Sequence, residues 1–110
     1  MLQFDEHFNG NKIELHPGQE FKIILHENPT TGFHWNPISL GEPACTLLDN
    51  SFDVNGIAPG NRGSHSWHFQ AVQEGLGKIE IVYRRSWEQA RPPAQSFNLS
   101  VYVQNKMHEM

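Results

Sequence analysis

The feature that most constrains this chain is a period-two alternation of apolar and polar residues, repeated in short runs. An alternating run places every second side chain on one face, as a half-buried β-strand requires. We expect strands at 12–15, 20–25, 33–37, 64–72, 78–83 and 97–103, and a further one within 46–54, where the alternation is less clear. Nine Gly and seven Pro lie mostly between these runs. Turns rather than helices are therefore expected to join the strands.

Seven short strands in 110 residues predict an all-β fold, a single immunoglobulin-like antiparallel β-sandwich of about seven strands. The length fits one domain spanning residues 1–110. Trp35 and Trp67 lie in phase with other inward-facing residues, so we expect both in the core. An antibody-type domain would show a Cys…Trp…Cys pattern, which the single cysteine, Cys45, excludes. The pattern leaves the strand order open.

Charge and hydropathy exclude several classes of partner. The net charge is −4, with eight acids and two lysines before residue 60. No basic stripe of the kind that phosphate backbones attract is present, so we expect no nucleic-acid partner. No run is long or apolar enough to span a membrane, and no leader peptide is visible. We expect a cytoplasmic protein, or a periplasmic one if a leader has been removed.

The residues that carry metal and acid–base chemistry show no recognised pattern. His65 and His68 are three apart on an expected strand, which puts them on opposite faces and makes them a poor ligand pair. The other histidines lack a partner at ligand spacing, so we expect neither a metal site nor a cofactor. The neighbours of Cys45 match no catalytic signature, and a buried structural thiol is the preferred interpretation. We therefore expect a protein that is not an enzyme.

Three polar segments between the expected strands are candidates for binding, because loops gather at the ends of a sandwich. They consist of Asn28, Pro29, Thr30, Thr31, Gly32 and Phe33; of Gly60, Asn61, Arg62, Gly63 and Ser64; and of Arg85, Ser86, Trp87 and Glu88. In the first, Pro29 fixes its own φ and Gly32 accepts positive φ, which predicts a rigid turn. Trp87 is a candidate interface anchor. The alternatives are an ordinary turn, a plain connector and a lid that folds over the end of the sandwich.

In this order the three segments resemble those of the chagasin family of cysteine-protease inhibitors, which carry an NPTTGF loop, a GxGG loop and an RPW loop on a β-sandwich. Residues 28–33 match the first loop in full. Residues 60–63 match the second only at their outer glycines, and 85–87 have Ser86 where the family has Pro. The expected strands also fall where the family would have them, so the resemblance covers nearly the whole chain.

The resemblance implies a monomeric, reversible inhibitor of papain-like cysteine proteases. The three segments would form a wedge that enters the protease cleft, with Thr31 beside the catalytic cysteine and with Trp87 and the glycine segment on either side. Ser86 leaves the third segment freer than Pro would, and Asn61 and Arg62 make the second bulkier. The alternative is a non-catalytic module on the same fold that binds a sugar or a peptide on Trp87.

Overall fold

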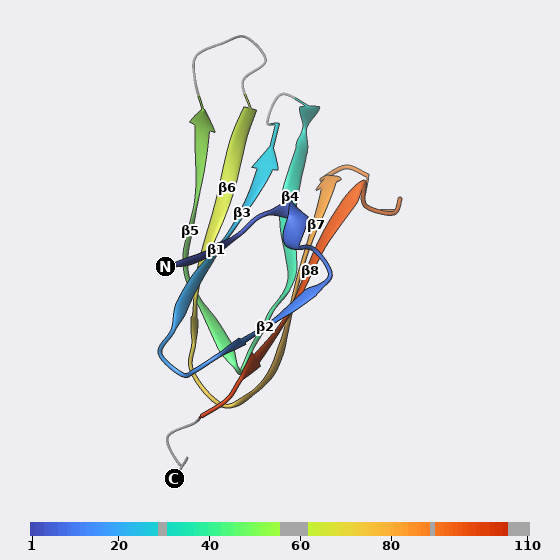
Figure 1. Cartoon of the computed structure of the whole chain (residues 1–110). Coiled ribbons are helices and arrows are strands. Elements are labelled where there is room, and N and C mark those ends of the chain that lie inside the picture. Colours follow the sequence, from blue (N-terminus) through green and yellow to red (C-terminus); the bar gives the residue numbers. More distant parts are fainter. Residues whose placement is uncertain (29–30, 56–61, 89, 106–110) are drawn as a thin grey trace.

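Two four-stranded β-sheets pack face to face around an apolar core (Figure 1). The computed structural model describes residues 1–28, 31–55, 62–88 and 90–105. Sheet A has the strand order β1-β3-β6-β5, formed by Leu2–Phe4, Glu20–Glu27, Arg62–Ala71 and Cys45–Asn55. Sheet B has the order β2-β8-β7-β4, formed by Asn11–Leu15, Gln95–Val103, Gly75–Arg85 and Phe33–Leu40. The predicted all-β sandwich is confirmed.

The amino-terminal segment contributes to both sheets. The short strand β1 pairs in parallel with β3, and after one 3-10 turn, η1 (Glu6–Phe8), the chain crosses to sheet B, where β2 pairs in parallel with β8. The other strand pairs are antiparallel. The described part of the chain thus has eight strands where the alternation predicted seven, because β1 is too short to show a period. Among the described residues no helix has the length and hydropathy needed to cross a bilayer.

The core follows the predicted alternation. Trp35 and Trp67 are buried, as expected, with only 5% and 1% of their surfaces exposed. Most of the fully buried side chains come from the inward positions of β3, β6, β7 and β8: Phe21, Ile23, Leu25, Phe69, Ala71, Ile79, Ile81, Phe97, Leu99, Val101 and Val103. Burial of apolar area on this scale is the dominant favourable contribution to folding.

Cys45 lies in this core at the start of β5, where it is 1% exposed. Burial raises the pKa of its thiol to about 11, because an apolar environment disfavours the thiolate. The thiol therefore stays protonated at neutral pH. This confirms the structural role expected from the sequence.

Candidate functional site

The three candidate segments emerge at one end of the sandwich (Figure 1). In sheet A, Gly63 pairs with Glu27 on one side and with residue 54 on the other, so β3 and β5 end where β6 begins. In sheet B, Phe33 pairs with Arg85, so β4 begins where β7 ends. The connections β3–β4, β5–β6 and β7–β8 therefore leave the same edge of the molecule. We call this edge the loop end.

The first segment begins as a closed turn. The backbone N–H of Thr31 donates to the carbonyl of Asn28 at 3.3 Å, and the Thr31 hydroxyl donates to the same oxygen at 2.9 Å. The N–H of Asn28 donates to the Tyr83 hydroxyl at 3.1 Å, which ties the turn to β7. Gly32 has a φ of 81°, in the left-handed region that favours glycine. Thr31 is exposed at the tip, and Pro29 and Thr30 lie outside the described residues.

Arg85 joins the first segment to the third. Its Nε donates to the carbonyl of Thr31 at 3.1 Å, and its guanidinium carbon lies 4.4 Å from the centre of the Phe33 ring. Its Nη1 lies 3.4 Å from a carboxylate oxygen of Glu88, whose own N–H donates to the Arg85 carbonyl at 3.1 Å. A planar guanidinium can hold a carbonyl, a ring and a carboxylate at once, which an ammonium group cannot. One side chain therefore connects both segments.

Trp87 lies at the outer surface of this unit and is 68% exposed. A Cβ built on Gly32 would lie 2.5 Å from the indole Cη2, so the indole rests against the backbone of Gly32. The guanidinium of Arg85 lies 5.8 Å from the ring centre. Trp87 is therefore not part of the buried core, and most of its surface faces solvent beside Gly32. Ser86, the departure from the family motif, is exposed.

The second segment is only partly a loop. Gly60 and Asn61 lie outside the described residues, whereas β6 starts at Arg62, so Gly63 and Ser64 are paired strand residues. Gly63 is buried, and a Cβ built there would collide with the Phe52 ring and lie 2.8 Å from the carbonyl oxygen of Asp53. The glycine is therefore needed because β5 packs closely against it.

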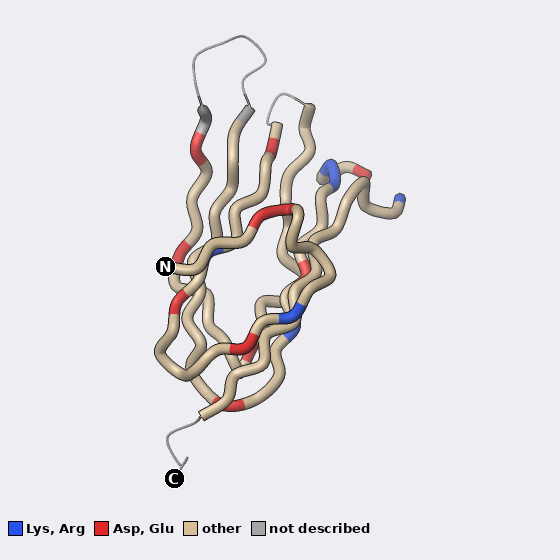
Figure 2. The backbone as a smooth tube through the Cα atoms, in the orientation of Figure 1, with Lys and Arg blue, Asp and Glu red and all other residues tan. Residues whose placement is uncertain are grey.

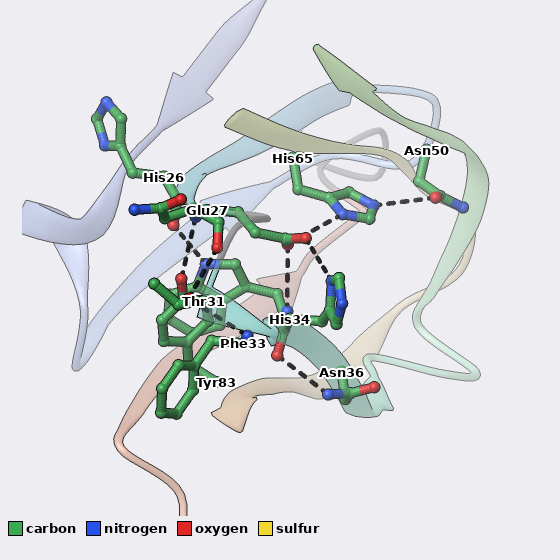
Figure 3. Close-up of polar contacts among 11 residues, drawn as sticks. His26, Glu27, Thr31, Phe33, His34, Asn36, Asn50, His65 and Tyr83 are labelled. Atoms are coloured by element: carbon green, nitrogen blue, oxygen red, sulfur yellow. Dashed lines mark hydrogen bonds and ion pairs between the residues drawn. The ribbon is translucent and has the colours of Figure 1, made fainter. Parts of the chain in front are cut away.

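A buried carboxylate that the sequence reading missed lies directly below these segments. Glu27, the last residue of β3, is 6% exposed, and it is the buried charged residue of the described chain. It accepts a hydrogen bond from the Trp35 N–H at 3.2 Å and lies 2.8 Å from His34 Nδ1 and 3.5 Å from His65 Nδ1 (Figure 3). The alternation in the sequence could have identified it, because Glu27 continues the inward-facing positions of Phe21, Ile23 and Leu25.

Charge is unevenly distributed over the molecule. Figure 2 shows that Lys and Arg are sparse along the strands and gather where β7 ends and in the segment that follows it. His65 and His68 lie on opposite faces of β6, as expected: His65 stacks on Trp67, and His68 contacts Glu20 at 2.7 Å on the outer face. In the part of the chain that the structure describes, no three His, Cys, Asp or Glu side chains are grouped so as to hold a metal ion.

Comparison with known proteins identifies the family. Residues 14–101 match the model described as Chagasin family peptidase inhibitor I42. Amoebiasin-1 of Entamoeba histolytica is 36% identical over 110 residues, which cover 94% of this chain and 100% of that protein. The family match spans all three candidate segments and nearly the whole sandwich.

Solved structures share the fold. The cysteine protease inhibitor EhICP2 from Entamoeba histolytica has a TM-score of 0.83 at 21% identity, covering 94% of this chain and 95% of that one. PbICP-C, solved in complex with falcipain-2, has a TM-score of 0.71 at 14% identity, covering 94% and 100%. At these identities the likeness concerns the fold alone. The family match and the relative that is 36% identical go further: this chain belongs to the chagasin family of cysteine-protease inhibitors, whose members are not enzymes.

Proposed function

We propose that this chain reversibly inhibits papain-like cysteine proteases and that segments 28–33, 60–64 and 85–88 enter the active-site cleft together. The observation that carries the proposal is the Arg85 bridge, which joins segments 28–33 and 85–88 into one unit. Segment 60–64 leads into β6 at the same end of the sandwich. PbICP-C, which shares the fold, was solved in complex with falcipain-2. That complex supports a cysteine protease as the partner.

The chemistry of the target explains why such a unit would inhibit. A papain-like enzyme attacks a peptide carbonyl with an activated thiolate, so a substrate must offer that carbonyl in the right orientation. Here the carbonyl of Thr31, at the exposed tip, already accepts a hydrogen bond from Arg85 within the inhibitor itself. The hydrogen bond fixes the orientation of this carbonyl within the inhibitor, so the segment would fill the cleft without the carbonyl turning toward the thiolate. Because hydrogen bonds already hold Asn28 and Thr31, less conformational entropy is lost at these residues on binding.

Trp87 supplies the best candidate for an anchor. Tryptophan and arginine dominate interface hot spots, and this indole is exposed beside Gly32 rather than buried in the core. Ser86 lacks the fixed φ of the proline that the family motif has, so the backbone before Trp87 depends more on the Arg85–Glu88 contacts for its order.

The test is a titration of papain, or of a cathepsin-L-type enzyme, with the purified protein and with the Thr31→Ala/Trp87→Ala double variant. We expect tight, reversible inhibition that the double variant weakens by about 30-fold or more. Leu76→Ala is the matched control, because Leu76 is 63% exposed at the other end of β7. Full enzyme activity at micromolar inhibitor, across several papain-like enzymes, would contradict the proposal.

The exposure of Trp87 also favours a second candidate, a non-catalytic module that stacks a sugar or a peptide on this indole. The two functions are distinguished by testing one protein preparation both for papain inhibition and for sugar or peptide binding. Saturable sugar or peptide binding, lost in Trp87→Ala and without any effect on papain, would favour the second candidate over the inhibitor.

A further inference from the structure

Glu27 is an unusual residue to find between the two sheets of an apolar sandwich. A carboxylate removed from water is destabilising unless hydrogen bonds or opposite charges compensate for it. Glu27 is 6% exposed. The nearby core positions of β3, Ile23 and Leu25, are fully buried and apolar. A chain that retains a carboxylate at the next inward position has a contact there that an apolar side chain would not make.

The contacts of Glu27 reach both sheets. Oε1 accepts the Trp35 N–H at 3.2 Å, and Oε2 lies 2.8 Å from His34 Nδ1; both partners belong to β4 in sheet B. Oε1 also lies 3.5 Å from Nδ1 of His65, on β6 in sheet A. The carboxylate therefore holds the two sheets together where the candidate segments begin, as the dashed lines in Figure 3 show.

Two of the partners of Glu27, His65 and Trp35, are held in place by further contacts. The ring of His65 stacks on Trp67 with centres 4.1 Å apart, and its Nε2 lies 3.0 Å from Asn50 Oδ1 on β5. The indole N–H of Trp35 donates to the carbonyl of His26 at 2.7 Å, and its ring lies 4.7 Å from the Tyr83 ring. Movement of the carboxylate would therefore shift groups on β4 and β6 and, through Tyr83 and Asn50, on β7 and β5.

These contacts bracket the first candidate segment. Glu27 immediately precedes Asn28, and its partners His34 and Trp35 immediately follow Phe33. Both stems of segment 28–33 therefore meet at one carboxylate. Glu27 also pairs with Gly63 in the strand register, so the strand that leaves the second segment begins beside the same residue.

We propose that Glu27 is a positioning residue for inhibition: its negative charge, acting through His34, His65 and the Trp35 N–H, sets the spacing of the segments that enter the protease. This rests on the proposed function and goes beyond it, since Glu27 lies outside the three segments. The residue touches no protease group itself. Its effect on the inhibition constant is transmitted through the stems of the segments.

Other titratable groups face the same region. Glu6 of η1, Tyr83 of β7 and His26 of β3 line a hollow of about 330 Å³ next to Glu27. Glu6 accepts hydrogen bonds from the His26 N–H at 2.7 Å and contacts its Nδ1 at 2.8 Å. Burial alone would raise the pKa of Glu6, but these bonds leave it below its ordinary value. Glu6 is thus engaged with His26 and leaves His34 and His65 to Glu27.

The test compares Glu27→Gln with Glu20→Gln. Glutamine keeps an acceptor for the Trp35 N–H but carries no charge. Glu20 forms the matched pair with His68, at 2.7 Å, on the same two strands and far from the loop end. We expect Glu27→Gln to raise the inhibition constant about tenfold over Glu20→Gln, the size of a lost hydrogen bond to a charged partner.

The pH profile separates a charge effect from a packing effect. Burial lowers the pKa of His65, and the Glu27 carboxylate acts in the opposite direction, so an amide at this position removes the group that favours the protonated imidazole as pH falls. The ratio of the two variants' inhibition constants, which cancels the titration of the protease, is expected to be at least about threefold larger at pH 5.5 than at pH 8. A ratio near one at both pH values would overturn the proposal.

Amide hydrogen exchange in the free protein gives a readout that needs no protease. We expect faster exchange at Trp35 and at residues 31–33 in Glu27→Gln, and unchanged exchange in Glu20→Gln. If the wild type inhibits nothing while these rates change, the proposed function fails and the positioning role stands. Unchanged rates and unchanged inhibition refute the role alone. If Glu27→Gln does not fold, the same comparison is made between His34→Gln and His68→Gln. Equal inhibition by those two variants would also overturn the proposal.

Discussion

The two ends of the sandwich fill the space between their sheets differently. Away from the loop end, the space is filled by hydrocarbon: Phe21 and Phe69 stack with ring centres 5.1 Å apart, and Val103 is fully buried. At the loop end, the corresponding space holds the Glu27 carboxylate and the imidazole of His65. The fold is continuous between them, because β3 and β6 run through both regions.

The difference indicates a division of roles along the strands. Apolar burial is favourable and non-directional, so it stabilises the fold without fixing fine geometry. Hydrogen bonds depend steeply on distance and angle and so define the position of the groups that they join. The apolar region is thus expected to set the stability of the protein, and the polar region to set the shape of the segments that meet the protease.

The largest expected effect is on stability, from Phe69→Ala in the apolar region. Removing a fully buried ring is expected to lower the free energy of unfolding by about 3–5 kcal/mol. Urea denaturation measures it. The inhibition constant, corrected for the folded fraction, should stay the same. A change of that constant would show that the two regions do not have separate roles.

Arg85→Ala should weaken inhibition and leave the free energy of unfolding nearly unchanged, the opposite of Phe69→Ala. Loss of the contacts to Thr31 and Phe33 and of the ion pair with Glu88 is expected to weaken inhibition by about 2 kcal/mol, roughly 30-fold. The free energy of unfolding should change by less than about 1 kcal/mol, since these contacts are near the surface. Arg91→Ala removes an equal charge from the exposed part of the same connection and serves as the control. Equal inhibition by both variants would argue against the bridge.

Gly32→Ala tests the contact between the first and third segments. The change places a Cβ 2.5 Å from the Trp87 ring and strains a positive φ, at a conformational cost of about 1–2 kcal/mol. Gly18→Ala carries similar strain, at a φ of 97°, with no described atom within 4 Å of the new Cβ. Both variants should lose similar stability, but only Gly32→Ala should weaken inhibition, by about tenfold. Equal inhibition constants would show that the position of Trp87 does not matter.

The smallest expected effect concerns pH and stability. Burial lowers the pKa of His65, the nearby His34 lowers it further, and Glu27 acts in the opposite direction. The folded state thus favours the neutral imidazole, and the unfolded state binds the proton more readily. This contribution to stability is present above about pH 6.5 and is lost as pH falls toward the lowered value. The urea midpoint should fall less between pH 7.5 and 5.5 in His65→Gln than in the wild type; equal falls would contradict this.

Much of the sandwich could be predicted from the sequence, because alternation reports directly on which face of a strand is buried. Phe21, Ile23, Trp67 and Phe69 lie inward as the period predicted. The strand β1 was not predicted, because three residues show no period and its pairing with β3 is non-local. The strand order stayed open for the same reason: pairing depends on contacts between segments far apart in the chain.

The loop end was predicted less completely. The motif pointed to three candidate binding segments, but it did not predict that Arg85 bridges two of them, nor that β6 already begins at Arg62. Glu27 was overlooked although it lies in phase with Leu25, because a carboxylate is rarely placed in a core without a known partner. His34 and His65 are 31 positions apart in the chain, and only the fold brings both to Glu27.

The most direct test of the role of the loop end is an amide hydrogen-exchange footprint of the protein bound to a papain-like protease. We predict protection at residues 31–33, 62–64 and 85–88, and unchanged exchange at the opposite end, around Gly18 and Leu76. Protection that is confined to the opposite end, or to the outer face of either sheet, would contradict the central claim that the loop end is the inhibitory surface.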